Sequence, residues 1–281
     1  MRRIDMHIHT IASDGAFTAE EAVLEAVNKE MNVIAISDHD SVSSVQRCIN
    51  LAKTEGIRVI PAMEATTNHH GVEYHILGYG LDITNPKLLS YCADTAKIRI
   101  SRETEIVMQA CEMFSDLNMS DYLAFSKETH VRGGFLSLNF LTHVGKVTNL
   151  NEFLALKSKM DLSGVRPFHS SSEVTAMLKE LGCVIVLAHP SYHFPGKVAD
   201  EKLLDEFLAL GINGIECYSP YNALPEQIAY YRAYCKKHGL AVSAGSDCHG
   251  PYLTREMGTP FATDEMCSIV SMIDSRADKS V

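Results

Sequence analysis

The chain has 281 residues, of which 46% are hydrophobic and 21% are charged, and its formal net charge is −10 at pH 7. These values are ordinary for a soluble globular protein, and the acidic balance argues against a stable nucleic-acid coat, since such proteins neutralise phosphates with Lys and Arg. The sequence has no apolar run near the roughly 20 residues of a membrane span and no signal-peptide pattern. We therefore expect a cytoplasmic protein with no membrane partner.

Strand and helix patterns alternate at the start of the chain. Four strands are predicted, at 3–9, 33–37, 57–62 and 72–80, and two helices, at 18–31 and 42–55. Thr18 and Glu21 have the spacing of a capping box at the start of the first helix. The order strand, helix, strand, helix, strand predicts a parallel sheet.

The alternation then stops and resumes only near residue 171. Between these points the pattern is helical, with one long helix at 86–114 and a Gly-Gly turn after Arg132. The second half adds helices at 172–181, 201–210, 224–238 and 264–274, and strands at 183–188, 213–218 and 241–244. The predicted organisation is a first barrel part at 1–81, a helical insertion serving as a substrate lid at 82–170, a second barrel part at 171–275 and a disordered tail at 276–281.

The first strand ends in a motif typical of metal binding. His7 and His9 are one residue apart, which places both imidazoles on the same face of a strand. Asp14 follows in a Ser-Asp-Gly turn, where Gly15 lets the chain bend back toward the strand end. Imidazole and carboxylate together suit Zn, Mn or Fe. For this motif alone, strand histidines satisfied by hydrogen bonds remain an alternative.

Similar side chains follow nearly every predicted strand, at the end where α/β barrels build their sites. The predicted metal ligands are His7, His9, Asp14, His39, Glu64, His75, His189, Asp247 and His249. One metal takes about four to six donors, so this set predicts two or three ions, with Glu64 as the bridging carboxylate. Glu216 also ends a predicted strand, but it is not assigned as a ligand.

Other polar residues near these strand ends are given supporting roles. Asp5, Asp38 and Asp40 are expected to hold imidazoles in the correct tautomer, with a loop or capping role as the alternative for Asp40. The remaining histidines, His69 and His70 among them, are interpreted mostly as surface or core residues.

The motifs resemble those of a known family. They are His-x-His-x4-Asp-Gly at 7–15, Ser-Asp-His-Asp at 37–40, Ala-His-Pro at 188–190 and Gly-Ser-Asp-x-His-Gly at 245–250. This set is similar to the PHP (polymerase and histidinol phosphatase) superfamily, and most of all to its branch of 3′,5′-nucleoside bisphosphate phosphatases and 5′-to-3′ exoribonucleases. The resemblance implies an α/β fold, a distorted seven-stranded TIM-like (β/α) barrel with a helical insertion, a trinuclear centre of Mn, Fe or Zn, and hydrolysis of phosphate esters.

Such a centre predicts hydrolysis by a hydroxide that bridges two metal ions and attacks phosphorus in line. His189 and Asp247 are the predicted catalytic residues, and either His189 or a metal-bound water is the expected general acid.

Four residues are predicted to bind the substrate. Arg99, Arg102 and Arg132 are chosen because a guanidinium binds phosphate bidentately, and Asn222 because family members often carry a His at this place. A solvated helix face paired with nearby glutamates is the alternative for Arg99 and Arg102. Because the pocket residues depart from the family pattern, the identity of the substrate stays open.

The preferred interpretation is a hydrolase acting on a small nucleotide or on the 5′ end of short RNA or DNA. A phosphatase for histidinol phosphate or another phosphomonoester would use the same metal ligands. A non-catalytic metal-binding module is a weaker alternative, because none of the predicted ligands is missing. An amidohydrolase would require a bridging lysine at a strand end, and the sequence has none there.

Overall fold

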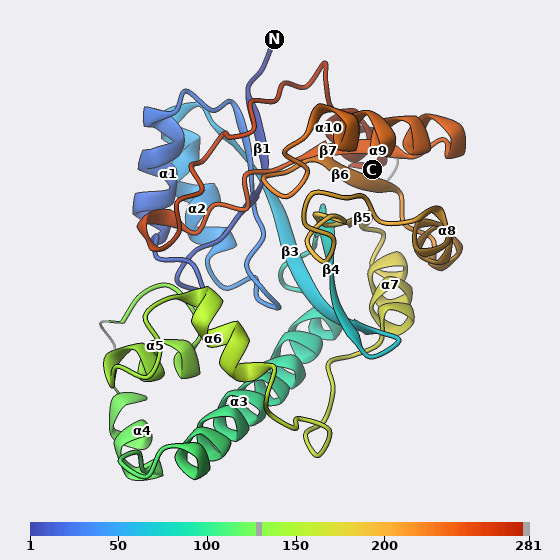
Figure 1. The fold of residues 1–281 in the computed structure, drawn as a ribbon. Coiled ribbons are helices and arrows are strands. Elements are labelled where there is room, and N and C mark those ends of the chain that lie inside the picture. Colours follow the sequence, from blue (N-terminus) through green and yellow to red (C-terminus); the bar gives the residue numbers. More distant parts are fainter. Residues whose placement is uncertain (128–130, 278–281) are drawn as a thin grey trace.

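The computed structural model describes residues 1–127 and 131–277. Its centre is one sheet of seven strands that follow one another in chain order (Figure 1). The strands are β1 (Ile4–Ile8), β2 (Val33–Ile36), β3 (Arg58–His69), β4 (Val72–Tyr79), β5 (Val184–Leu187), β6 (Gly214–Tyr218) and β7 (Ala241–Ala244). A bridge between Ile8 and Cys248 brings the chain after β7 back to β1, so the sheet closes into a barrel. All seven predicted strands are confirmed.

The prediction of a parallel sheet is wrong for one strand. β4 is antiparallel to both β3 and β5, whereas the other neighbouring strands pair in parallel. Only two residues, His70 and Gly71, connect β3 to β4, and both have positive φ, at 53° and 86°. Such a turn forms a hairpin, while a parallel connection needs a crossover of about a dozen residues. The first half of β4 therefore lies at the barrel end where the parallel strands finish.

Helices cover the outside of the barrel. They are α1 (Ala19–Asn28), α2 (Val45–Ala52), η1 (Lys53–Glu55), α7 (Ser171–Glu180), α8 (Glu201–Leu210), α9 (Pro225–His238) and α10 (Ile269–Ala277). The short helix η2 (Gly250–Tyr252) instead faces the helical segment, against which its Tyr252 packs. Thr18 caps α1 and forms the predicted capping box with Glu21. α10 includes the first two residues of the expected tail, and residues 278–281 lie outside the described part of the chain. Within the described ranges, no helix combines the length and apolarity needed to span a bilayer.

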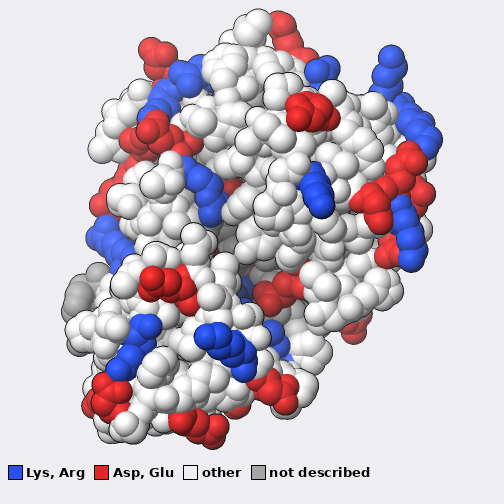
Figure 2. Space-filling model, in the orientation of Figure 1, with Lys and Arg blue, Asp and Glu red and all other residues white. Residues whose placement is uncertain are grey.

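Between β4 and β5 the chain forms a second group of helices. This helical segment consists of α3 (Pro86–Met113), α4 (Met119–Phe125), α5 (Leu136–His143) and α6 (Leu150–Lys157). Most of its buried residues, Phe140 and Leu141 among them, form a hydrophobic cluster of their own, while Leu88 and Tyr91 at the start of α3 pack into the core of the barrel. The helical segment lies against one end of the barrel (Figure 1), and the surface is hollowed where the two meet (Figure 2). This recess is where the predicted site residues gather.

Candidate metal centre

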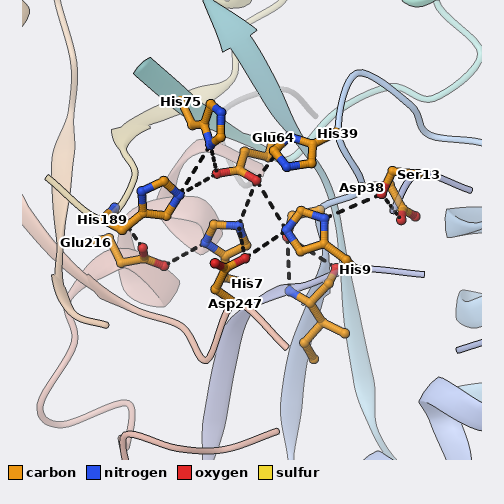
Figure 3. A network of polar contacts seen from close by, with 12 residues as sticks. His7, His9, Ser13, Asp38, His39, Glu64, His75, His189, Glu216 and Asp247 are labelled. Carbon is orange, nitrogen blue, oxygen red and sulfur yellow. Dashed lines mark hydrogen bonds and ion pairs between the residues drawn. The ribbon is translucent and has the colours of Figure 1, made fainter. Parts of the chain in front are cut away.

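The predicted ligands converge at the barrel end that faces the helical segment. Eight of the nine fall into three overlapping groups of potential ligand atoms, and the ninth, His189, adjoins them through Glu64 (Figure 3). The groups are His9 with Asp14, His39 and His249; His7 with His9, Glu64 and Asp247; and His39 with Glu64 and His75. Residues far apart in the sequence therefore form one continuous cluster.

Glu64 lies in the middle of this cluster, where the prediction places a bridging carboxylate. Its Oε2 atom is 3.1 Å from His7 Nε2, 3.2 Å from His9 Nε2 and 3.3 Å from His39 Nδ1. Its Oε1 atom is 2.8 Å from His189 Nε2 and 3.1 Å from His75 Nδ1. Two different sets of imidazoles thus face the two oxygens of a single fully buried carboxylate.

Asp14 and Asp247 complete the cluster on either side of His9. Asp14 Oδ2 lies 3.2 Å from His249 Nε2, and Asp14 Oδ1 lies 3.4 Å from His9 Nδ1. Asp247 Oδ1 is 3.1 Å from His9 Nε2 and 3.5 Å from His7 Nε2. His9 therefore links both carboxylates to Glu64.

The innermost atoms of the cluster fit a bound metal. His7 Nε2, His9 Nε2, His39 Nδ1 and Glu64 Oε2 are buried and have no hydrogen-bond partner within the described residues. Buried polar atoms without partners are costly, and it is unusual for four of them to face one another. Imidazole nitrogens and a carboxylate oxygen are the ligand set of first-row divalent metals, so a cation at this place would satisfy all four atoms.

The electrostatics also favour ligation. Burial lowers the pKa of His9 and holds that of His39 well below its usual value, so both imidazoles stay neutral and can donate a lone pair to a metal. Burial alone would raise the pKa of Asp14, but His249 and His39 hold it well below its usual value. His7 differs, because the carboxylates of Glu64 and Glu216 outweigh the effect of burial and raise its pKa to about 10. A metal at His7 must therefore displace a proton.

Local backbone features bring the ligands this close. A side chain at Gly245, directly after β7, would overlap His7 Cβ. A Cβ at Gly15 would lie 2.6 Å from the carbonyl carbon of His9, so the turn after Asp14 folds back onto the strand end as predicted. His189 and Asp247 adopt positive φ values of 22° and 49°, which non-glycine residues rarely do and which cluster at functional sites.

The residues that support the ligands are not those expected. Glu216 Oε1 is 2.9 Å from His7 Nδ1, and its Oε2 accepts a hydrogen bond from the His189 backbone N–H at 2.9 Å. Asp5 instead accepts backbone N–H groups of Ser246 and Gly258. The available signal was a single carboxylate within an otherwise apolar predicted strand, since Glu216 lies in the middle of β6.

Within the described residues, Asp38 and Asp40 form no direct hydrogen bond or ion pair with an imidazole. Asp38 accepts hydrogen bonds from Thr10 N and Ser13 Oγ at 2.6 and 2.8 Å, which fixes the loop that carries Asp14. Asp40 accepts one from Thr66 N at 2.9 Å and forms an ion pair with Arg99. The oxygens of both residues are engaged by backbone, hydroxyl and guanidinium donors, so neither holds an imidazole directly. Asp38 reaches His9 only through Ser13 Oγ, which lies 3.4 Å from His9 Nδ1.

A cavity of about 270 Å³ opens above the cluster, and two of the four predicted substrate residues line it. Arg99 Nη2 lies 2.5 Å from Asp40 Oδ2, and Arg102 Nη2 lies 3.7 Å from Glu73 Oε2. Both guanidinium groups lie over the ring of Phe168. The helix α3 thus directs two cations into the recess.

The other two predicted substrate residues lie elsewhere. Arg132 forms an ion pair with Glu21 at 2.9 Å, and both side chains are about half exposed, at 48% and 47%. Asn222 is fully buried and its Nδ2 donates to the backbone oxygens of Glu216 and Cys217. The structure therefore does not bring either residue to the cavity.

The cavity also contains residues that the sequence did not single out. Arg255 donates a hydrogen bond to Asp247 Oδ2, and Tyr221 Oη lies 3.2 Å from the same oxygen. Lys157 and Tyr192 line the wall with them. These residues lie in loops and in the helical segment, where no motif spacing marks them.

The chain is similar in sequence and in fold to known proteins of one family. Residues 5–153 match the PHP domain model. A 5′-3′ exoribonuclease of Haemophilus influenzae is 28% identical over 262 residues, covering 92% of this chain and 93% of the relative. A 3′,5′-nucleoside bisphosphate phosphatase of Chromobacterium violaceum is 25% identical, covering 89% and 88%. The solved structure of a candidate metal-dependent phosphoesterase from Bifidobacterium adolescentis is 27% identical, with a TM-score of 0.82 over 97% of this chain and 96% of that one. Because the matched residues make up more than half of the chain, the protein belongs to the PHP domain family.

Proposed function

We propose that this protein is a metal-dependent phosphoesterase that hydrolyses a phosphate ester of a small nucleotide or of the 5′ end of a short oligonucleotide. The observation that carries the proposal is the position of the ligand cluster. It forms the floor of a cavity whose wall holds the guanidinium groups of Arg99 and Arg102. Metal ligands below and phosphate-binding cations above suit a phosphorylated substrate.

The proposed metal ligands are the nine residues predicted from the sequence. The three overlapping groups that eight of them form favour two or three ions, and the imidazole and carboxylate donors suit Mn, Fe or Zn. Divalent metals in such a centre lower the pKa of water and neutralise charge on the phosphoryl group. Binding and orienting the rest of the substrate is then the role of side chains in the cavity wall.

Arg99 and Arg102 are the proposed phosphate-binding residues. Arg99 lies between the rings of Phe135 and Phe168, at 4.6 and 5.0 Å from their centroids, and Asp40 holds one of its nitrogens. A guanidinium has five N–H donors, so these contacts fix its direction and leave donors for a phosphate. The guanidinium of Arg102 also lies over the ring of Phe168, 5.2 Å from its centroid. The α3 helix thereby presents a rigid pair of cations to the substrate.

His189 and Asp247 are proposed to act as metal ligands during catalysis. Burial lowers the pKa of His189, which favours the neutral form that ligates over the protonated form that donates a proton. Asp247 directs Oδ1 toward His7 and His9, while Arg255 and Tyr221 bind Oδ2. This arrangement holds the carboxylate in one orientation.

The nucleotide part of the proposal draws on the relatives and on the cavity walls. Relatives named as a bisphosphate phosphatase and as an exoribonuclease match nearly the whole chain. Tyr192 and Tyr221 line the cavity with ring centroids 5.1 Å apart, and Tyr192 is 37% exposed, so it offers a face on which a base can stack. The helical segment, which closes the recess from one side, is proposed to act as a substrate lid.

The test is phosphate release by Mn-loaded protein from four substrates, each with and without a chelator. These are 3′,5′-bisphosphorylated adenosine, a short 5′-phosphorylated RNA, histidinol phosphate and an aryl phosphate. Chelator-sensitive preference for either nucleotide substrate supports the proposal, and the Asp247→Asn variant should lack that activity. Preference for histidinol phosphate would instead support the phosphomonoesterase alternative, and no hydrolysis of any of the four would contradict a phosphoesterase.

A further inference from the structure

Two histidines that the metal centre does not use lie together at the tip of the β3–β4 hairpin. His69 is the last residue of β3, and His70 is the first residue of the turn. Consecutive residues of a strand point to opposite faces, but the positive φ of His70, 53°, turns its side chain back toward its neighbour. The two imidazole centroids are 4.4 Å apart as a result.

A carboxylate from another element faces both rings. Glu206, on α8, has its Oε2 atom 2.9 Å from His69 Nε2 and 3.3 Å from His70 Nε2. Both rings therefore direct the same type of nitrogen at one oxygen, which is the pattern that surrounds Glu64 in the metal centre. The three potential ligand atoms lie within 4.8 Å of one another.

The surroundings hold this arrangement in place. The ring of His69 stacks on Phe207 at 4.5 Å, and only 11% of its side chain is exposed. His70 is 77% exposed, so an ion from solvent can reach the group and can keep water as a further ligand. Lys202 Nζ lies 3.9 Å from the other carboxylate oxygen of Glu206, Oε1, so this ion pair leaves Oε2 to the two imidazoles.

We propose that His69, His70 and Glu206 form a second metal site that binds one Zn²⁺-class ion and fastens the β3–β4 hairpin to α8. Two imidazoles and one carboxylate are a common ligand set for zinc, with water in the fourth position. The site is distinct from the metal centre: Thr66 pairs with His75, and His69 lies three residues farther along β3, roughly 10 Å at the rise of a strand. Figure 1 shows the hairpin tip extending beyond the barrel on the side of α7 and α8.

The test counts zinc bound per chain. Wild type and two variants, His70→Asn and Glu206→Gln, are saturated with Zn²⁺, dialysed against the same buffer and measured by mass spectrometry of the released metal. Asn tolerates the left-handed backbone of position 70, so that variant removes the imidazole without straining the turn. His143→Asn, which replaces an exposed histidine outside every ligand group, is the matched control.

We expect wild type and His143→Asn to retain one zinc more per chain than His70→Asn and Glu206→Gln. Zinc should also raise the melting temperature of the wild type more than that of either variant, because the ion links two elements of the fold. All four proteins should hydrolyse phosphate esters equally when loaded with Mn²⁺, since none of the changes touches the metal centre. Equal zinc content in all four proteins would overturn the proposal, whatever substrate the enzyme accepts.

Discussion

Replacing Glu216 by Gln tests whether this carboxylate sets the tautomer of His7, and so which ring nitrogen faces the metal centre. Glu216 is fully buried and accepts two hydrogen bonds, one from the backbone N–H of His189 and one at His7 Nδ1. A backbone N–H can only donate, so the single oxygen of the Gln amide must remain at His189. The amide NH₂ then faces His7 Nδ1, which must give up its proton and become an acceptor. A neutral His7 would then carry its proton on Nε2, the atom that faces Glu64 and Asp247.

The size of the effect follows from this tautomer change. In the wild type, the carboxylate of Glu216 keeps the proton on His7 Nδ1 and leaves the Nε2 lone pair for a metal. Loss of such a supporting hydrogen bond typically lowers metal affinity or activity by about 10 to 100-fold, or roughly 1.4 to 2.7 kcal/mol. Because Gln has nearly the same volume as Glu, the packing of the barrel should change little.

The assay is a titration of chelator-treated protein with Mn²⁺, followed through phosphate release. We expect Glu216→Gln to need about 10 to 100-fold more Mn²⁺ for half-maximal activity and to recover much of its activity at saturating metal. Glu226→Gln, an exposed change in the first turn of α9, is the control and should behave like the wild type. A Glu216→Gln variant with wild-type metal dependence would show that His7 does not ligate through Nε2.

Three further predictions test other parts of the site. Arg102→Met should raise KM at least about tenfold through the loss of a charged hydrogen bond to phosphate, whereas Arg132→Met, which breaks only a surface pair with Glu21, should leave KM unchanged in the same assay. Gly245→Ala should lower activity on the order of a hundredfold, because the new methyl group must displace His7 by a fraction of an ångström or more; wild-type turnover would contradict this close contact. The raised pKa of His7, about 10, means that its proton stabilises the metal-free fold fully below pH 6.5, and that this stabilisation is lost as the pH rises toward 10. Urea unfolding of chelator-treated protein should therefore show a decline from pH 7 to pH 10 that Mn²⁺-loaded protein lacks.

The sequence was enough to predict the barrel strands and the cluster of imidazoles and carboxylates at their ends. The direction of the side chains in a strand repeats every two residues, so the spacing of His7 and His9 already placed both imidazoles on one face. Ligand residues such as Asp247 follow strands that are nearly all apolar, so the change from apolar to polar marks the strand end. Short local patterns of this kind do not depend on how distant segments pack.

The residues that the sequence misplaced depend on packing between distant segments. Arg102 and Arg132 are both arginines of the helical segment, yet only Arg102 lies at the cavity. Which of them does so is decided by how α3 packs against the barrel and by the presence of Glu21 on α1, and neither is encoded near the arginines themselves. Arg255 was missed for a different reason, because it reaches Asp247 within the loop that follows β7, and an irregular loop has no side-chain period that would predict the contact.

The direction of β4 connects the metal centre to the proposed hairpin site. If β4 were parallel, residues early in the strand would lie at the far end of the barrel, and His75 could not approach Glu64. The antiparallel hairpin instead pairs His75 with Thr66, two residues from Glu64, and places His75 Nδ1 3.1 Å from Glu64 Oε1. The turn that makes this possible needs a residue of positive φ at position 70, where the chain has a histidine. One backbone feature thus brings a ligand into the metal centre and also turns His70 beside His69, so zinc binding at the hairpin tip would stabilise the strand pair that holds Glu64 and His75.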